Sequence, residues 1–247
     1  MRARTIAGAR RILAGFDVSL SRLSRTTPAQ RARFINDAAI TVVLDVGAHI
    51  GDYAGSLRRF GYKGRIESFE PLARAHAELS SRAAGDPLWT CHRLALGDTS
   101  GTLTLHVAGN EVSSSALDML PRHMQGDPGS SYVSAEQVKV RTLDELDLMD
   151  ASDRVYLKAD VQGFEQRVLA GAGRTLESVQ LLEVELSLVQ LYEAGPLFTE
   201  MLKYLKDLHF EPIWFEPAFI DAGTGRLLQL DGIFARDTSS SPDTLPA

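Results

Sequence analysis

The stretch VVLDVGAHIGDY, residues 42–53, decides the fold, because it joins an apolar strand pattern to a glycine-containing turn. The residues before Gly47 are mostly β-branched and show no polar alternation, which is typical of a strand buried on both faces. Gly47 and Gly51 then give the backbone freedom that other residues lack, and they leave space for a ligand to lie against the main chain. Ligands of open α/β sheets bind beyond the carboxyl ends of the strands. The stretch therefore predicts a strand, a ligand-binding turn and a helix.

The rest of the chain alternates strand and helix patterns. Strands are expected at residues 41–47, 65–71, 88–98, 102–108, 138–146, 153–161, 179–187, 210–217 and 227–237. Helices are expected at 51–60, from Pro71 onward, at 164–176 and from Pro196 onward, where apolar residues recur at helical spacing. Strand–helix alternation that ends in a pair of strands predicts one α/β domain with a doubly wound, mostly parallel sheet and an antiparallel edge.

Three segments differ from this pattern. Residues 1–36 form an arginine-rich arm with eight arginines and one acidic residue, and the domain is expected to span 37–237. The arm is predicted to be an amphipathic capping helix with solvated arginines; a transit peptide and a contact with anionic lipid or a phosphorylated substrate are the alternatives. Residues 109–137 look irregular, so they are either a lid over the acceptor or a disordered insertion. The tail, 238–247, is expected to be disordered.

Composition narrows the class of protein. The 247 residues carry a formal net charge of −6 and contain a single cysteine, Cys91. An acidic body argues against nucleic acid as a partner, and no apolar run is long enough to span a bilayer. A lone cysteine fits a reducing compartment, so a cytoplasmic protein is expected. Oligomeric state is left open.

The chemistry of the first turn favours a cationic ligand. It reads Asp45-Val46-Gly47-Ala48-His49-Ile50-Gly51 and lacks the middle glycine of the dinucleotide pattern G-x-G-x-x-G. Carboxylates next to the turn would repel a diphosphate, which argues against an NAD-linked oxidoreductase. They suit S-adenosylmethionine, which carries a sulfonium and an amino group. We therefore expect residues 45–51 to hold its methionine part, with Asp45 favouring the positive charge.

Two later strand ends support the same cofactor. Glu70 ends the second strand nineteen residues after Gly51, where a carboxylate can accept both ribose hydroxyls. Leu96-Gly97-Asp98 follows the next strand; Leu96 is expected to cover an adenine face and Asp98 or a backbone group to read its amino edge. Together these residues predict an S-adenosylmethionine site.

These motifs resemble one known family. LDVGAHIGDY, SFEP, ALGD, VRTLDEL, LKADVQGFEQRVLAGA and LLEVELS occur in the order seen in the FkbM family of S-adenosylmethionine-dependent methyltransferases, over about residues 41–236. The resemblance implies the class I methyltransferase fold, a Rossmann-like seven-stranded sheet. It also implies O-methylation, often of a sugar or polyketide hydroxyl in secondary metabolites or glycolipids. His49 stands where the family usually has Asn, so cofactor binding is expected to depend on pH.

The best catalytic candidates lie in KADVQGFE. Asp160 follows a buried strand beside the expected methyl group, so it is predicted to be the general base or to orient the acceptor hydroxyl, with Lys158 or Glu165 tuning it. The alternative is an ion pair of Lys158 and Asp160 that fastens the sheet end. Glu183 shares a strand face with Glu185 and either faces the site or caps the sheet; Asp231 is a weaker candidate of the same kind.

Several questions stay open. No protein metal motif occurs, although Mg²⁺ held by Asp160 and neighbouring acids is an alternative. N-methylation is not separated from O-methylation. The remaining rival is a catalytically silent Rossmann-like protein that binds a partner through the arm, without cofactor affinity.

Overall fold

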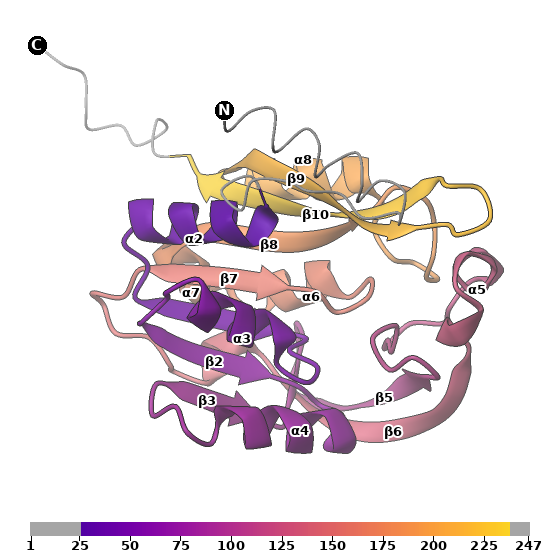
Figure 1. The fold of residues 1–247 in the computed structure, drawn as a ribbon, viewed down its shortest axis with the longest axis horizontal. Helices are drawn as coiled ribbons and strands as arrows, with labels where there is room; N and C mark the ends of the chain where they lie inside the picture. Colours follow the sequence, from indigo (N-terminus) through magenta and orange to yellow (C-terminus); the bar gives the residue numbers. More distant parts are fainter. Residues whose placement is uncertain (1–25, 238–247) are drawn as a thin grey trace, which may run out of the picture.

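The computed structural model describes residues 26–237, and its centre is a seven-stranded sheet of order β3-β2-β1-β7-β8-β10-β9 (Figure 1). The first five of these strands are parallel, and β10 pairs antiparallel with both β8 and β9. The bounds are β1 Val42–Val46, β2 Arg65–Phe69, β3 Trp89–His92, β7 Val155–Ala159, β8 Val179–Ser187, β9 Phe210–Ile220 and β10 Leu227–Arg236. The predicted mostly parallel sheet with an antiparallel edge is confirmed.

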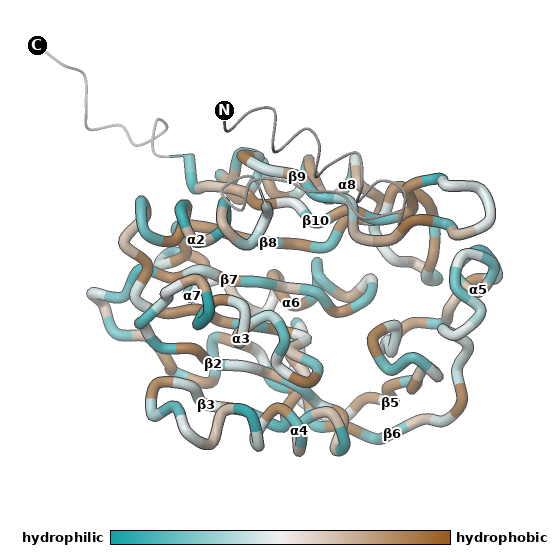
Figure 2. The backbone as a smooth tube through the Cα atoms, viewed as in Figure 1, coloured by the Kyte–Doolittle hydropathy of each residue, from teal (hydrophilic) through white to brown (hydrophobic). Residues whose placement is uncertain are grey.

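Helices cover both faces of this sheet. On one face, buried side chains of α2, α3 and α4 pack on the central strands; on the other, those of α6, α7 and α8 do so. Polar positions interrupt the otherwise hydrophobic strand β8 between these layers (Figure 2). The bounds are α2 Thr27–Asp37, α3 Asp52–Arg59, α4 Ala73–Ala83, α6 Glu165–Ala170, α7 Gly173–Ser178 and α8 Phe198–Asp207. The single helix expected at 164–176 is thus two short ones.

A second, three-stranded sheet of order β4-β6-β5 corrects three expectations. Its strands are β4 Ala95–Leu96, β5 Gly101–Ala108 and β6 Tyr132–Arg141. The strand expected at 88–98 is therefore two strands in different sheets, and the one expected at 138–146 begins earlier. Residues 109–137, expected to be irregular, contain α5 Pro121–Gly126, the 3₁₀ turn Pro128–Ser130 and the start of β6. In Figure 1, α5 lies beyond the end of β5 and the start of β6.

The strand order reverses between β1 and β7. The chain runs from β1 outward through β2 to β3 and later returns to the other side of β1 as β7. The backbones that leave these two strands stay in contact, since the amide of Asp160 donates to the carbonyl of Val46 at 3.1 Å. Ligands of doubly wound sheets bind at such a reversal. The fold thus places the turn at Gly47 beside Asp160.

Helix α2 belongs to the core, although its sequence lies mostly in the predicted arm. Thr27, Arg31 and Ile35 share its buried face, and the side chain of Arg31 reaches Glu183 of β8, to which its Nε donates at 2.7 Å. The expectation of solvated arginines is wrong for Arg31, which is 8% exposed. The predicted boundary between residues 36 and 37 falls within this helix.

The remaining segments of the arm and tail, residues 1–25 and 238–247, lie outside the described part of the chain. Within the described part, no helix is long and apolar enough to cross a membrane.

Candidate active site

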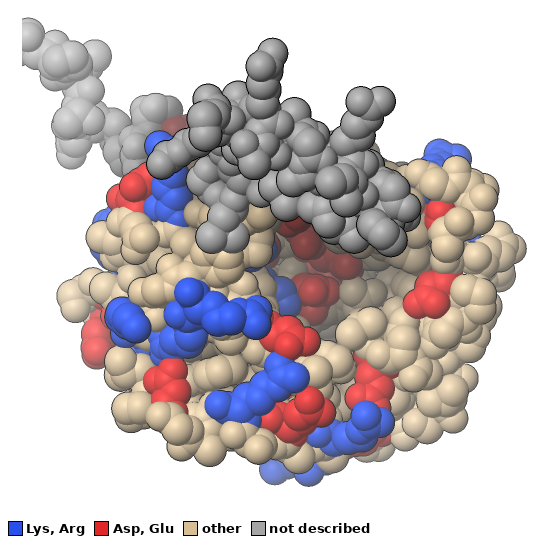
Figure 3. Space-filling view, in the orientation of Figure 1, with Lys and Arg blue, Asp and Glu red and all other residues tan. Residues whose placement is uncertain are grey.

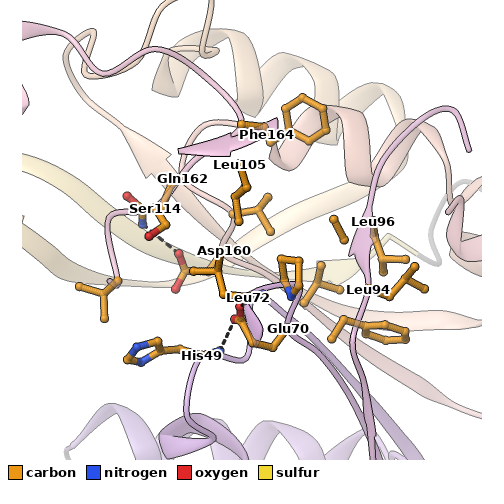
Figure 4. A pocket seen from close by; sticks show the side chains of 18 of the residues that line it. His49, Glu70, Leu72, Leu94, Leu96, Leu105, Ser114, Asp160, Gln162 and Phe164 are labelled. Atoms are coloured by element: carbon orange, nitrogen blue, oxygen red, sulfur yellow. Dashed lines mark hydrogen bonds between the residues drawn. The ribbon is translucent and has the colours of Figure 1, made fainter. Parts of the chain in front are cut away.

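A cleft opens at the carboxyl ends of β1 and β2 and is closed on its far side by the second sheet and residues 111–116. Its walls are largely apolar, and polar groups enter at a few points: Glu70, His49, Asp160 and Gln162 among them (Figure 4). The apolar lining consists of Val46, Phe69, Pro71, Leu72, Leu94, Ala95, Leu96, Leu103, Leu105, Val112, Ala116, Val161 and Phe164. Concave sites of this composition are typical of small-molecule binding.

Glu70 is the buried carboxylate of the cleft. Its two oxygens accept one backbone hydrogen bond each, from the amide of His49 at 2.9 Å and the amide of Leu72 at 2.8 Å. Burial raises its pKa to about 7. Because each carboxylate oxygen has a second lone pair, Glu70 can still accept from ligand hydroxyls.

His49 contributes its backbone amide to the cleft, where the amide donates to Glu70. Burial lowers the pKa of the imidazole, so the ring is neutral at pH 7. Its Nε2 is buried without a hydrogen-bond partner, 3.9 Å from Glu111 Oε2. Burial therefore works against the expected titration of His49 near neutral pH.

Gly47 and Gly51 are also required by the protein itself, apart from the room for the cofactor that the sequence predicts. Both have left-handed backbones, with φ of 79° and 88°. A Cβ on Gly47 would lie 1.8 Å from the carbonyl oxygen of Asp160, and one on Gly51 would lie 2.9 Å from Leu79 Cδ1. The first glycine therefore permits the close approach of the two strand ends. Gly47 lines the cleft, whereas Ala48 and Gly51 are not among its lining residues.

Asp45 does not face the cleft. It is fully buried, accepts from Ser68 Oγ at 3.2 Å, and its Oδ1 lies 3.6 Å from Lys158 Nζ. Burial raises the pKa of Asp45. The expectation that its carboxylate points at the cofactor's positive charge is not supported by this placement, since its charge faces Lys158.

Lys158 joins the glycine turn to Asp160. Its Nζ donates to the carbonyl of Gly47 at 3.1 Å and lies 3.3 Å from Asp160 Oδ2. Burial lowers the pKa of this ammonium, but the carboxylates of Asp160 and Asp45 outweigh burial and the pKa is raised. Lys158 is therefore a fixed cation. Its contacts with Gly47 and Asp160 are compatible with both predicted roles, which are to fasten the sheet end and to tune Asp160.

Of Leu96, Gly97 and Asp98, only Leu96 lines the cleft. The amide of Gly97 donates to the carbonyl of Arg141 at 3.1 Å, which ties β4 to β6. Asp98 accepts from Arg167 Nη1 at 2.9 Å and lies outside the lining. The placement supports the expected adenine contact for Leu96 and does not support one for Asp98.

Asp160 also borders a second, charged cavity on the other side of β7. Figure 3 shows acidic side chains gathered in a central hollow of this face. The cavity is lined by Arg31, Tyr53, Lys158, Ala159, Asp160, Glu183, Glu185 and Asp231. Burial, followed by the charge of Asp160, raises the pKa of Glu185 well above its usual value, and burial raises that of Asp231 to about 7. Asp160 is the one acid among the described residues that lines both the cleft and this cavity.

Glu183 and Glu165 are engaged within the protein. Glu183 lines the charged cavity, but its carboxylate already accepts from Arg31, Tyr53 and Tyr156. Glu165 Oε1 accepts from the amides of Val161 at 2.9 Å and Gly163 at 3.1 Å, and burial raises its pKa to about 7. Glu165 thus shapes the turn after β7, and it lines neither cavity.

Gln162 is a site residue that sequence reasoning missed. Its Nε2 donates to Asp160 Oδ1 at 3.1 Å and to Glu185 Oε2 at 2.9 Å. Nothing in the sequence marks Gln162 except its place two residues after Asp160.

The residues of the cleft fit S-adenosylmethionine. Glu70 keeps free lone pairs for ribose hydroxyls, the apolar walls around Leu96 suit an adenine ring, and the unpartnered Nε2 of His49 offers a polar contact. Among residues 26–237, no group of three or more His, Cys, Asp or Glu side chains is arranged to hold a metal ion.

Comparisons with known proteins agree with this assignment. The Methyltransferase FkbM domain family matches residues 45–212. The 2-O-methyltransferase NoeI of Sinorhizobium fredii (strain NBRC 101917 / NGR234) is 24% identical over 161 residues, 62% of this chain and 65% of that protein. The chain thus spans slightly less than two thirds of that relative's length.

Solved structures resemble the chain at lower sequence identity. An rRNA methylase from Streptococcus thermophilus has a TM-score of 0.49 at 10% identity, covering 87% of this chain and 99% of its own. Aeropyrum pernix fibrillarin with bound S-adenosyl-L-methionine has a TM-score of 0.41 at 14% identity, covering 79% and 66%. The family match covers most of the chain and includes Glu70 and Asp160. The protein therefore belongs to the FkbM family of methyltransferases.

Proposed function

We propose that the protein transfers a methyl group from S-adenosylmethionine to a hydroxyl of a sugar, glycolipid or polyketide-type acceptor. One observation carries this proposal: Asp160 lines both an apolar cleft suited to the cofactor and a charged cavity suited to a polar acceptor. The donor and the acceptor can therefore meet at a carboxylate. The similarity to a 2-O-methyltransferase supports a hydroxyl as the acceptor group.

The cofactor side of this proposal rests on Glu70 and the apolar walls. S-adenosylmethionine, when bound, supplies a methyl group activated by its sulfonium. Glu70 would accept hydrogen bonds from the ribose hydroxyls, and Leu72, Leu96 and Phe164 would exclude water from the adenine. The backbone amide of His49 holds Glu70 for this task at 2.9 Å.

The acceptor side rests on Asp160. Its side chain is 36% exposed, so it is accessible from the cavities, and Lys158 and Gln162 fix its two oxygens. The carboxylate can accept the proton of an acceptor hydroxyl as oxygen attacks the methyl carbon, which is general-base catalysis. Alignment of the two reactants supplies the remaining acceleration.

Residues 109–137 are proposed to form the lid of the site. Glu111, Val112 and Ser114 line the cleft, and α5 follows them. The segment is also tied to the turn after β7, since Ser115 Oγ donates to the carbonyl of Gln162 at 2.7 Å. Closure of such a segment would exclude water from the reacting groups.

We expect Glu70→Gln to lower the affinity for S-adenosylhomocysteine about 100-fold, because hydrogen bonds to a charged group contribute roughly 1.5–3 kcal/mol each. Calorimetric titration of the full chain measures this, with NAD as the control ligand. Glu67→Gln on β2, the strand that Glu70 follows, is the matched control, because Glu67 pairs with His92 and lies outside the cleft lining. A folded wild-type protein that binds no S-adenosylhomocysteine would overturn the proposed function.

Affinity for S-adenosylhomocysteine is also expected to fall about tenfold from pH 8 to pH 6. The pKa of Glu70 is raised to about 7, so the carboxylate that accepts from the ribose is ionised at pH 8 and mostly protonated at pH 6. Burial lowers the pKa of His49, which reduces its share of any change over this range. Calorimetry across this range measures the slope, which should disappear in Glu70→Gln; an unchanged slope in that variant would assign it to another group.

A further inference from the structure

The turn that follows β7 holds Gln162 in a backbone conformation that only a few non-glycine residues adopt. Its φ is +55°, in the left-handed region, and such a residue persists where its surroundings fix it. Glu165 accepts from the amides on either side of Gln162, and Ser115 donates to its carbonyl. The strained turn directs the side chain of Gln162 toward Asp160 and Glu185 (Figure 4 shows the first of these contacts).

The chemistry of the neighbours decides which way the amide of Gln162 faces. The carboxylate of Asp160 only accepts hydrogen bonds, so it requires the amide nitrogen, and the second proton of that nitrogen goes to Glu185 Oε2. The amide oxygen then faces the hydroxyl of Tyr192 at 2.6 Å and must accept from it. The phenol proton of Tyr192 is thereby committed to Gln162.

The direction of this hydrogen bond also constrains His123 of helix α5. The hydroxyl oxygen of Tyr192 lies 3.0 Å from His123 Nε2, and with its own proton donated to Gln162 it can only accept there. His123 is 2% exposed, and burial lowers its pKa, so the neutral ring carries its proton on Nε2. Its Nδ1 lies 2.9 Å from Ser130 Oγ, whose own proton goes to the carbonyl of Asp127 at 2.6 Å. The donations run in one direction, from His123 through Tyr192 and Gln162 to the two acids.

We propose that Gln162 is a positioning residue: its amide holds Asp160 and Glu185 side by side at the acceptor cavity, and Tyr192, oriented by His123, fixes that amide. The inference rests on the proposed function for its effect on turnover. With Oδ1 of Asp160 bound to Gln162 and Oδ2 facing Lys158, the carboxylate has one orientation toward the acceptor. The same chain links the acid pair to α5, within residues 109–137.

Other charged and titratable groups surround Asp160 and Glu185, the acid pair, and influence its pH dependence. They come from six elements: Arg31 of α2, Tyr53 of α3, Lys158 of β7, Glu165 of α6, Glu183 of β8 and Asp231 of β10. None of these residues is changed in the variants below, so a change in titration reports the loss of the amide or of its orientation.

Gln162→Met keeps the length of the side chain and removes both amide donors. We expect kcat to fall ten- to a hundredfold, and the acidic limb of the kcat/KM profile to move to higher pH, because both carboxylates lose a donor that favours their ionised form. NMR titration of ¹³C-labelled Glu and Asp side chains, without any substrate, should show the apparent pKa of Glu185 raised further. Unchanged turnover and an unchanged titration would overturn the proposal.

Tyr192→Phe tests the chain without touching the acids and provides a second variant if Gln162→Met fails to fold. We expect a smaller loss in kcat, about tenfold, with S-adenosylhomocysteine affinity within about threefold, because Tyr192 does not line the cofactor cleft. Tyr62→Phe is the matched control, since its hydroxyl donates to the remote carbonyl of Arg65. Equal behaviour of the two variants would overturn the role of Tyr192.

¹⁵N NMR of His-labelled wild-type protein tests the direction of the chain. The neutral Nε2–H tautomer of His123 is expected, and Tyr192→Phe should shift the tautomer balance because Nε2 loses its acceptor. An Nδ1–H tautomer in the wild type would overturn the proposal. If the proposed function were wrong, the protein would not bind S-adenosylhomocysteine. The ¹³C titration and the ¹⁵N tautomer measurement need no ligand, so they would still test the role of Gln162.

Discussion

Asp160→Asn is expected to lower kcat by about 10²- to 10⁴-fold, the contribution typical of a general base. Asparagine keeps the shape of the side chain but cannot take the proton of an acceptor hydroxyl. Binding of S-adenosylhomocysteine should change by less than about threefold, because the cofactor cleft gains its polar contacts mainly from Glu70 and His49. Initial rates with an acceptor found by screening sugars and glycolipids, together with calorimetry, measure the two quantities.

The control for this variant is Asp207→Asn, which removes one exposed carboxylate at the end of α8. It should leave both rate and affinity unchanged. An Asp160→Asn protein that binds S-adenosylhomocysteine and retains near-wild-type turnover would show that Asp160 is not the base. In that case the rate would depend on alignment alone, or on Glu185 across the shared amide of Gln162.

The central sheet could be predicted from sequence because each of its elements has a local signal. A run such as Val42–Val46 is buried on both faces, and a turn with Gly47 follows it directly. Short-range patterns of this kind decide strand and helix identity without knowledge of distant residues. Glu70 could be placed for the same reason, since it lies at the end of a recognisable strand.

The second sheet had no such signal. Strand β4 contains only Ala95 and Leu96, and its partner β6 begins more than thirty residues later. Two residues carry no periodicity, so the 88–98 pattern read as one strand. Strand β4 pairs with β6, whereas β3 pairs with β2, and these pairings form only in the folded chain.

Charged residues at the site were hardest to assign, because their partners are distant in sequence. Asp45 appeared to face a ligand, but Lys158, which neighbours it across the β1–β7 pair, takes its charge. Arg31 did carry a local signal: Thr27, Arg31 and Ile35 recur at a spacing of four residues, so one arginine lies on the apolar face of its helix. Its partner Glu183 lies 152 residues away and could not be inferred.

The Arg31–Glu183 pair fastens α2 over the charged cavity. Burial raises the pKa of Glu183, but the guanidinium of Arg31 and the hydroxyls of Tyr156 and Tyr53 outweigh burial, and the pKa is lowered. The guanidinium also lies over the ring of Tyr53, 4.6 Å from its centroid. Helix α2, helix α3 and strand β8 therefore meet at one carboxylate whose charge is balanced mainly by Arg31.

Arg31→Ala is expected to lower the free energy of unfolding by about 3–5 kcal/mol, because removing one partner of a buried ion pair leaves the other charge uncompensated. Urea denaturation of the full chain measures this. Arg33→Ala on the same helix is the matched control, since its side chain is 72% exposed and pairs with Asp37; its effect should stay within about 0.5 kcal/mol. Combining Arg31→Met with Glu183→Gln removes both charges and should restore part of the lost stability. If Arg31→Ala cost no more than Arg33→Ala, the ion pair would not fasten α2, and the place of Arg31 in the lining of the charged cavity would need another explanation.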